Sequence, residues 1–150
     1  MTDPAVVTRI TRLTSAFDYR DDSEAFLSAA NQLDDVQLIP KYFLLCHSIE
    51  LALKAHILGH GGTNGEIRKI KHDLRAALKR ARELGLQPAA EVEEVVRLVA
   101  PPHKDYSFRY TNDMWTQVLP TLEALAATVA ALIKQVSEAL PPHTAILQIK

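Results

Sequence analysis

Three side chains capable of acid–base or anion chemistry stand close together in the segment HSIELALK, namely His47, Glu50 and Lys54. On a helix that turns 100° per residue, they share one strip about 60° wide. Nearly every other residue of this helix is apolar, so the helix is expected to be central in the fold. The strip predicts a reactive site, a ligand pocket or a buried polar seam. Alternatively, Glu50 and Lys54 form an ordinary i,i+4 surface pair worth about 0.2–0.5 kcal/mol.

A second group of such residues lies downstream in KIKHDLRAAL, where His72 and Asp73 come at or near the start of the next helix. A helix dipole favours an aspartate in its first turn, which is a sufficient structural reason for Asp73. If the two helices are antiparallel, His72 or Asp73 can meet Lys54 or His56. The pair expected to be partly buried is Asp73 with Lys54.

The same stretch is locally basic. Its cations are Arg68, Lys69, Lys71, Arg75, Lys79, Arg80 and Arg82. Such a face suits phosphate contacts, and a solvated helix surface has the same composition.

An aromatic segment follows between residues 103 and 113, HKDYSFRYTND. Tyr106, Arg109 and Tyr110 are candidates to line a groove beside the strip, with aromatic faces for a base and a cation for phosphate. Phe108 is better explained as an anchor that holds this segment to the bundle. Thr111-Asn112-Asp113 resembles a helix cap.

The composition excludes several classes of protein. The chain has 150 residues, 47% of them hydrophobic and 23% charged, with a net charge of -1, which suits one globular domain without a global nucleic-acid footprint. One cysteine, Cys46, permits no internal disulfide and too few thiolates for a typical zinc site, so no metal and no cofactor is expected. With no signal peptide or membrane span visible, we expect a cytoplasmic protein.

Apolar residues recur at helical spacing, which predicts an all-α protein. The expected elements are a short N-terminal helix over 4–16, a second helix capped by Ser23, and a long one from Pro40 to about His60. A further helix begins between Glu66 and Lys71 and ends at Gly85.

The next helix opens at Pro88 and is expected to break at Pro101-Pro102. The last long helix runs through Trp115 to about Leu140, with Pro120 either kinking it or preceding its main part. Residues 141–150 form a tail. Together these elements predict a single domain over 1–150, an up-and-down bundle of four to five main helices.

The residues Glu50, Leu53 and Lys54, followed by His72-Asp73-Leu74, resemble the HEPN superfamily of small all-α domains. The resemblance covers about residues 38–84, and the last helix loosely. It implies a bundle of four or five helices, often a homodimer with a cleft between protomers. Members occur beside nucleotidyltransferases and in RNA-cleaving toxins and defence systems.

Ribonuclease members of that superfamily carry an Arg followed after four to six residues by a His, which act on the RNA 2′-hydroxyl and its phosphate. Arg109 has no His at this spacing, and Arg97 with His103 has the spacing but encloses Pro101-Pro102. Arg97 and His103 are therefore weak catalytic candidates.

Three hypotheses for function remain. The first is a non-catalytic, HEPN-like homodimer that binds RNA, a nucleotide or a partner protein such as a nucleotidyltransferase or an antitoxin, in a toxin–antitoxin or defence setting. The second is a metal-independent ribonuclease with His47 or His72 as base and Lys54 or Arg109 on phosphate. The third is a structural interaction domain. Convergence of His47, His72 and His103 near an Arg would favour the enzyme.

Overall fold

The computed structural model describes residues 3–110 and 118–142, and every regular element in those ranges is a helix. The expected all-α bundle is therefore confirmed. The described helices are α1 (Pro4–Gln32), α2 (Leu38–Gly59), α3 (Asn64–Ile70), α4 (Leu74–Glu83), α5 (Ala90–Lys104), α6 (Ser107–Tyr110) and α7 (Leu122–Ala139). None of them is long and apolar enough to cross a membrane.

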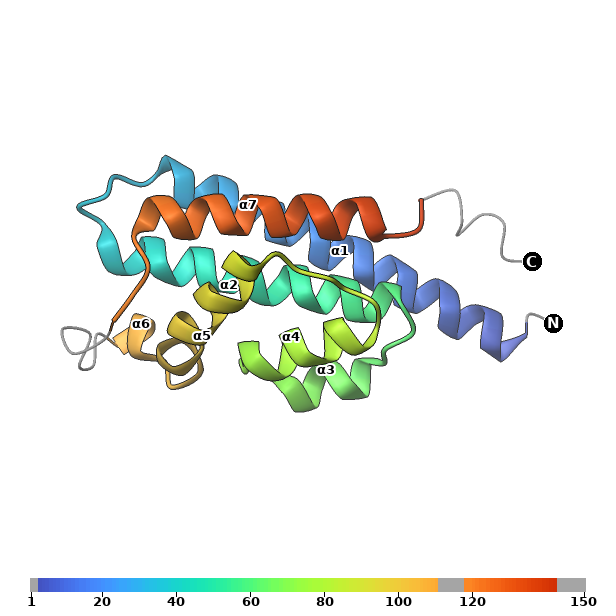
Figure 1. Cartoon of the computed structure of the whole chain (residues 1–150). Helices are drawn as coiled ribbons and strands as arrows, with labels where there is room; N and C mark the ends of the chain where they lie inside the picture. The colour runs from blue at the N-terminus through green and yellow to red at the C-terminus, as the bar shows by residue number, and fades with distance from the viewer. Residues whose placement is uncertain (1–2, 111–117, 143–150) are drawn as a thin grey trace.

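Helix α2 is the central rod of the bundle. It packs against α1 and α7 on one side and against α4, α5 and α6 on the other (Figure 1). Pro40 lies in its first turn, as expected, and Gly61 takes a φ of 101° just beyond its end. Leu45, Leu53 and Cys46 are fully buried along it. The residues of the polar strip therefore project from the most buried element of the fold.

Helix α1 is one continuous helix of 29 residues, so the predicted division into a helix over 4–16 and a second helix capped by Ser23 is wrong. Ser23 is buried inside α1, where its Oγ donates to the Ser48 carbonyl oxygen at 2.7 Å. The Ser48 hydroxyl donates back to the Ser23 carbonyl oxygen at 2.7 Å. A partner on α2, rather than a capping role, thus satisfies this mid-helix serine.

The helix expected between Glu66 and Gly85 is interrupted. α3 ends at Ile70, and α4 begins at Leu74 with Asp73 as its N-cap. Between them Lys71 has φ 53° and ψ -118°, and the Asp73 N–H donates to the Ile70 carbonyl oxygen. These values are typical of the first central position of a type II′ turn, which glycine usually occupies.

Helix α5 continues through Pro101 and Pro102 to Lys104, so the predicted break at these prolines is wrong. Pro101 has no N–H to donate to the carbonyl oxygen of Arg97 four residues earlier. Arg75 of α4 donates to that oxygen instead, at 3.2 Å. A contact from a neighbouring helix therefore replaces the bond that proline removes.

The last helix begins after Pro120, with Thr121 as its N-cap, and ends at Ala139. Pro120 therefore precedes this helix rather than kinking it. Trp115, the cap-like residues 111–113 and most of the predicted tail lie outside the described residues.

Candidate functional site

Glu50 is the centre of a cluster of ionisable side chains. It projects from α2 and is 2% exposed. Its Oε1 lies 2.8 Å from His72 Nδ1 and 3.4 Å from His103 Nε2, while its Oε2 lies 3.3 Å from His47 Nδ1 and 3.7 Å from Lys54 Nζ. Three histidines from α2, the turn after α3 and α5 therefore converge on one buried carboxylate.

This environment keeps Glu50 ionised. Burial raises the pKa of its carboxyl group, but the contacts with His103 and His47 and the charge of Lys54 outweigh burial and lower that pKa below its ordinary value. An ionised carboxylate only accepts hydrogen bonds, so the His72 Nδ1 that lies against it carries a hydrogen. In the neutral His72 ring, Nε2 is then the basic nitrogen.

Lys54 is nearly buried as well and is directed inward. Its Nζ donates to the Lys71 carbonyl oxygen at 2.7 Å, which ties α2 to the turn that carries His72. The strained backbone at Lys71 thus supports the cluster in two ways. Its carbonyl oxygen accepts a hydrogen bond from Lys54, and the turn that it forms carries His72 to Glu50. The surface interpretation of the Glu50–Lys54 pair is wrong.

His47 lies between two phenylalanines. Its ring stacks on Phe43 and meets the edge of Phe26, with centroids 5.9 and 4.6 Å apart. Although His47 Nδ1 is close to Glu50, the geometry does not make a hydrogen bond, and this buried nitrogen has no partner among the described residues. Such an orphaned polar atom costs free energy unless something else satisfies it.

Arg97 and His103 share α5 but diverge. His103 is buried against Glu50, whereas Arg97 is exposed and forms an ion pair with Glu94 at 2.6 Å. Six residues on a helix correspond to about 120° of separation around its axis. These two residues therefore do not build a common catalytic site.

Asp73 does not form the expected pair with Lys54. Its Oδ1 accepts the Ala76 N–H as the cap of α4, and its Oδ2 lies 3.0 Å from Lys104 Nζ. The capping and the lysine outweigh burial and lower the pKa of Asp73. The sequence correctly placed this residue at the helix start, and it is His72 that reaches the strip.

The aromatic segment lies beside the cluster. Tyr106 meets the edge of His72 with centroids 5.7 Å apart, and the Arg109 guanidinium lies over Tyr106 and Phe43 at 4.9 and 5.2 Å. Tyr110 is exposed and packs edge-on against Tyr106. By contrast, Phe108 is buried, as its expected anchoring role requires.

A hollow of about 280 Å³ opens beside His72. Its lining residues are Lys69, Ile70, Lys71, His72, Asp73, Lys104 and Tyr106. Three lysines face one aspartate there, and 30% of the His72 side chain is exposed. The hollow therefore joins a positive rim to a histidine held by a buried carboxylate.

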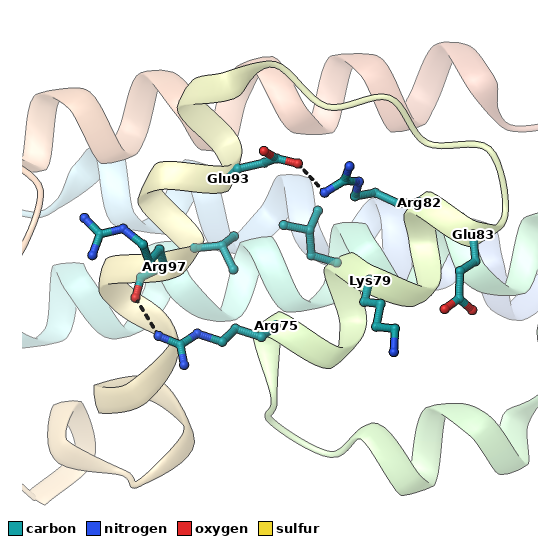
Figure 2. A pocket seen from close by; sticks show the side chains of 8 residues that line it. Arg75, Lys79, Arg82, Glu83, Glu93 and Arg97 are labelled. Carbon is teal, nitrogen blue, oxygen red and sulfur yellow. Dashed lines mark hydrogen bonds and ion pairs between the residues drawn. The ribbon is translucent and has the colours of Figure 1, made fainter.

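A second, larger groove of about 530 Å³ lies between α4 and α5 (Figure 2). Leu78 and Val96 are its apolar lining residues, and its charged residues are Arg75, Lys79, Arg82, Glu83, Glu93 and Arg97. Arg82 forms an ion pair with Glu93, which Figure 2 shows bridging the two helices. Of the basic stretch predicted from the sequence, Lys69 and Lys71 line the hollow, and Arg75, Lys79 and Arg82 line this groove.

Comparison of the chain with protein-family models, with characterised proteins and with solved structures finds no match. The site must therefore be interpreted from its own geometry. Sequence reasoning missed the contact of His103 with Glu50 and the part of Lys104 in the hollow. The first follows from extending the apolar stripe of Val92, Val96 and Val99 by one helical turn through the prolines to His103, whereas Lys104 lies about 100° further around the helix.

Proposed function

We propose that the protein binds phosphate groups of RNA or of a nucleotide at the hollow beside His72. The observation that carries this proposal is the lining itself, in which Lys69, Lys71 and Lys104 surround an exposed histidine edge and an aromatic face. Lysine ammonium groups bind phosphate oxygens, and aromatic rings such as Tyr106 stack on bases. Tyr106 is 39% exposed, which leaves it accessible for stacking.

A charge reversal tests this binding. Lys69→Glu is expected to weaken binding of a short fluorescent RNA about tenfold in a fluorescence-anisotropy titration, because it removes a phosphate contact and adds repulsion. Arg68→Glu is the matched control, since Arg68 is the exposed neighbour on α3 and does not line the hollow. Equal effects of the two substitutions, or no RNA binding by the wild type at low salt, would contradict the proposal.

Cleavage of the bound RNA is the second candidate function, and the convergence of the three histidines favours it. His72 resembles an oriented general base, because a carboxylate holds its Nδ1 and Nε2 is then the nitrogen that would accept a proton. It would take the proton of a 2′-hydroxyl, whose oxygen attacks the phosphorus. The 5′-oxygen would leave with a proton from water, giving a 2′,3′-cyclic phosphate. Arg109, unlike buried Lys54, is exposed beside Tyr106 as a phosphate ligand.

The measurement for cleavage is the appearance of 2′,3′-cyclic phosphate ends. His72→Ala should abolish them, and with a dinucleotide substrate Arg97→Ala should leave them unchanged, because Arg97 lines the α4–α5 groove and not the hollow. If the wild-type protein binds RNA without producing such ends, the proposed binding function stands and the ribonuclease function is excluded. The homodimer and the nucleotidyltransferase or antitoxin partner implied by the HEPN resemblance remain predictions.

A further inference from the structure

The polar cluster around Glu50 also has the donor set of a metal site. The potential ligand atoms are one ring nitrogen each from His47 and His103 and a carboxylate oxygen of Glu50, and these three lie within 4.8 Å of one another. Two imidazoles and one carboxylate are typical ligands of Zn²⁺ and of neighbouring first-row divalent ions. The sequence predicted no metal, since one cysteine is too few, but a site of this kind needs no thiolate.

The spacing of the atoms supports the same conclusion. Ligands about 2.0–2.1 Å from a tetrahedral ion are about 3.3–3.4 Å from each other. Glu50 Oε2 is 3.3 Å from His47 Nδ1, and Glu50 Oε1 is 3.4 Å from His103 Nε2. Each imidazole nitrogen therefore lies about one tetrahedral edge from a different oxygen of the same carboxylate, so binding one ion requires the side chains to close in from the 4.8 Å over which their ligand atoms spread.

A second observation concerns the direction of the His47 contact rather than its length. His47 Nδ1 is buried and has no hydrogen-bond partner among the described residues, although a carboxylate is adjacent. A buried polar atom without a partner is unfavourable, and coordination by an ion would satisfy it. The hydrogen bond between His72 Nδ1 and Glu50 would persist. Carboxylates that bind metals are usually held by such a hydrogen bond from a neighbouring group.

Lys54 opposes this site, because its ammonium lies 3.7 Å from Glu50 Oε2. A divalent cation between the same groups would feel this positive charge directly. The opposition makes the site testable, since removing the lysine charge must strengthen metal binding if the ion occupies this position.

We propose that His47, Glu50 and His103 bind one Zn²⁺ or a similar first-row divalent ion per chain, with a fourth coordination position left to water or to a ligand. This proposal goes beyond phosphate binding at the hollow and does not depend on it. Its test therefore contains no RNA, so that the two proposals fail separately.

The experiment is a titration of the chelator-treated full-length protein with Co²⁺, whose d–d absorption is intense in a tetrahedral site. The wild type should develop a saturable band at one Co²⁺ per chain, and Zn²⁺ should displace it. His47→Gln and His103→Gln should lose the band. His60→Gln should keep it, because His60 lies at the far end of α2 and contacts the Ala139 carbonyl oxygen.

Lys54→Met should bind Co²⁺ at least about tenfold more tightly than the wild type, since a like charge has been removed. Circular dichroism establishes that each variant is folded. Should a ligand variant fail to fold, the wild-type titration and Lys54→Met still decide. The proposal is overturned by a wild type without a saturable tetrahedral band, by a band that persists in both ligand variants, or by unchanged affinity in folded Lys54→Met.

Discussion

Glu50 keeps a negative charge in the interior because cationic or hydrogen-bonding groups approach both of its oxygens. His72 and His103 lie against Oε1, and Lys54 and His47 lie against Oε2. A buried carboxylate with fewer partners would be protonated or would destabilise the fold. The cluster therefore acts as a unit, in which each member depends on this one side chain.

Glu50→Gln should lower the free energy of unfolding by about 3 kcal/mol, because it leaves Lys54 and the histidines without the buried negative charge. Urea denaturation at neutral pH measures this loss. Glu24→Gln is the control, since Glu24 is exposed on α1 with a long, 4.0 Å contact to Arg20 and should change stability by at most about 0.5 kcal/mol. A Glu50→Gln variant as stable as the wild type would mean that the cluster holds no buried ion.

Lys71 carries strain that its backbone contacts make useful. A lysine at φ 53° costs about 1–3 kcal/mol relative to a residue that adopts this region freely. Lys71→Gly should therefore raise the free energy of unfolding by about 1 kcal/mol, after the higher entropy of glycine in the unfolded chain is subtracted. The bond from Lys54 persists because it reaches the main-chain oxygen.

The comparison for this prediction is Lys69→Gly, inside α3, which should lower stability by about 0.5–1 kcal/mol. Thermal unfolding should give a higher midpoint temperature for Lys71→Gly and a lower one for Lys69→Gly than for the wild type. A loss of stability in Lys71→Gly as large as in Lys69→Gly would show that the turn is not strained.

At the scale of elements, His56 links α2 to the end of α4. Its Nε2 donates to the Leu84 carbonyl oxygen at 3.1 Å, and its Nδ1 is buried without a partner among the described residues. Burial and the neighbouring His60 lower the pKa of His56 to about 4, although the Leu84 carbonyl acts in the opposite direction. The folded protein thus disfavours the charged ring.

The pH dependence follows from this pKa. The unfolded chain binds a proton to His56 near pH 6.5 and the folded chain only near pH 4, so the stability from the neutral ring is complete above about 6.5 and is lost as the pH falls toward 4. At pH 5 the loss should be about 2 kcal/mol. Urea unfolding at pH 7 and 5 should show a smaller decrease for His56→Gln than for the wild type. Identical decreases would exclude His56 as their source.

Element boundaries were predictable where local chemistry determines them. Pro40 and the glycines after Gly59 delimit α2, and Asp73 caps α4, each through backbone geometry or one neighbouring N–H. Predictions failed where a distant residue satisfies the backbone or side chain. Ser23 bonds to Ser48 across the α1–α2 contact, and Arg75 replaces the hydrogen bond lost at Pro101. No local pattern in the sequence encodes such long-range partners.

The candidate site shows the same division. The helical spacing of His47, Glu50 and Lys54 placed them on one strip, and the following helix start was expected to meet it. That expectation is confirmed, but by His72 rather than by Asp73. His72 rather than Asp73 meets the strip because of the turn at Lys71. A lysine in the sequence does not predict the positive φ that this turn requires.

For the whole molecule, a net charge of -1 means that any attraction for RNA must come from an uneven distribution of charge. Basic residues line the hollow, and others line the α4–α5 groove, across which Arg75 donates to the Arg97 carbonyl oxygen (Figure 2). A dinucleotide that contacts only the hollow has one internucleotide phosphate and should show a slope of about -0.7 for log K against log salt concentration. An RNA dodecamer that extends into the groove should approach about -5, and Lys79→Glu should reduce its affinity without changing that of the dinucleotide. Equal slopes for the two RNAs would confine binding to the hollow, and slopes near zero for both would exclude phosphate contacts at either place.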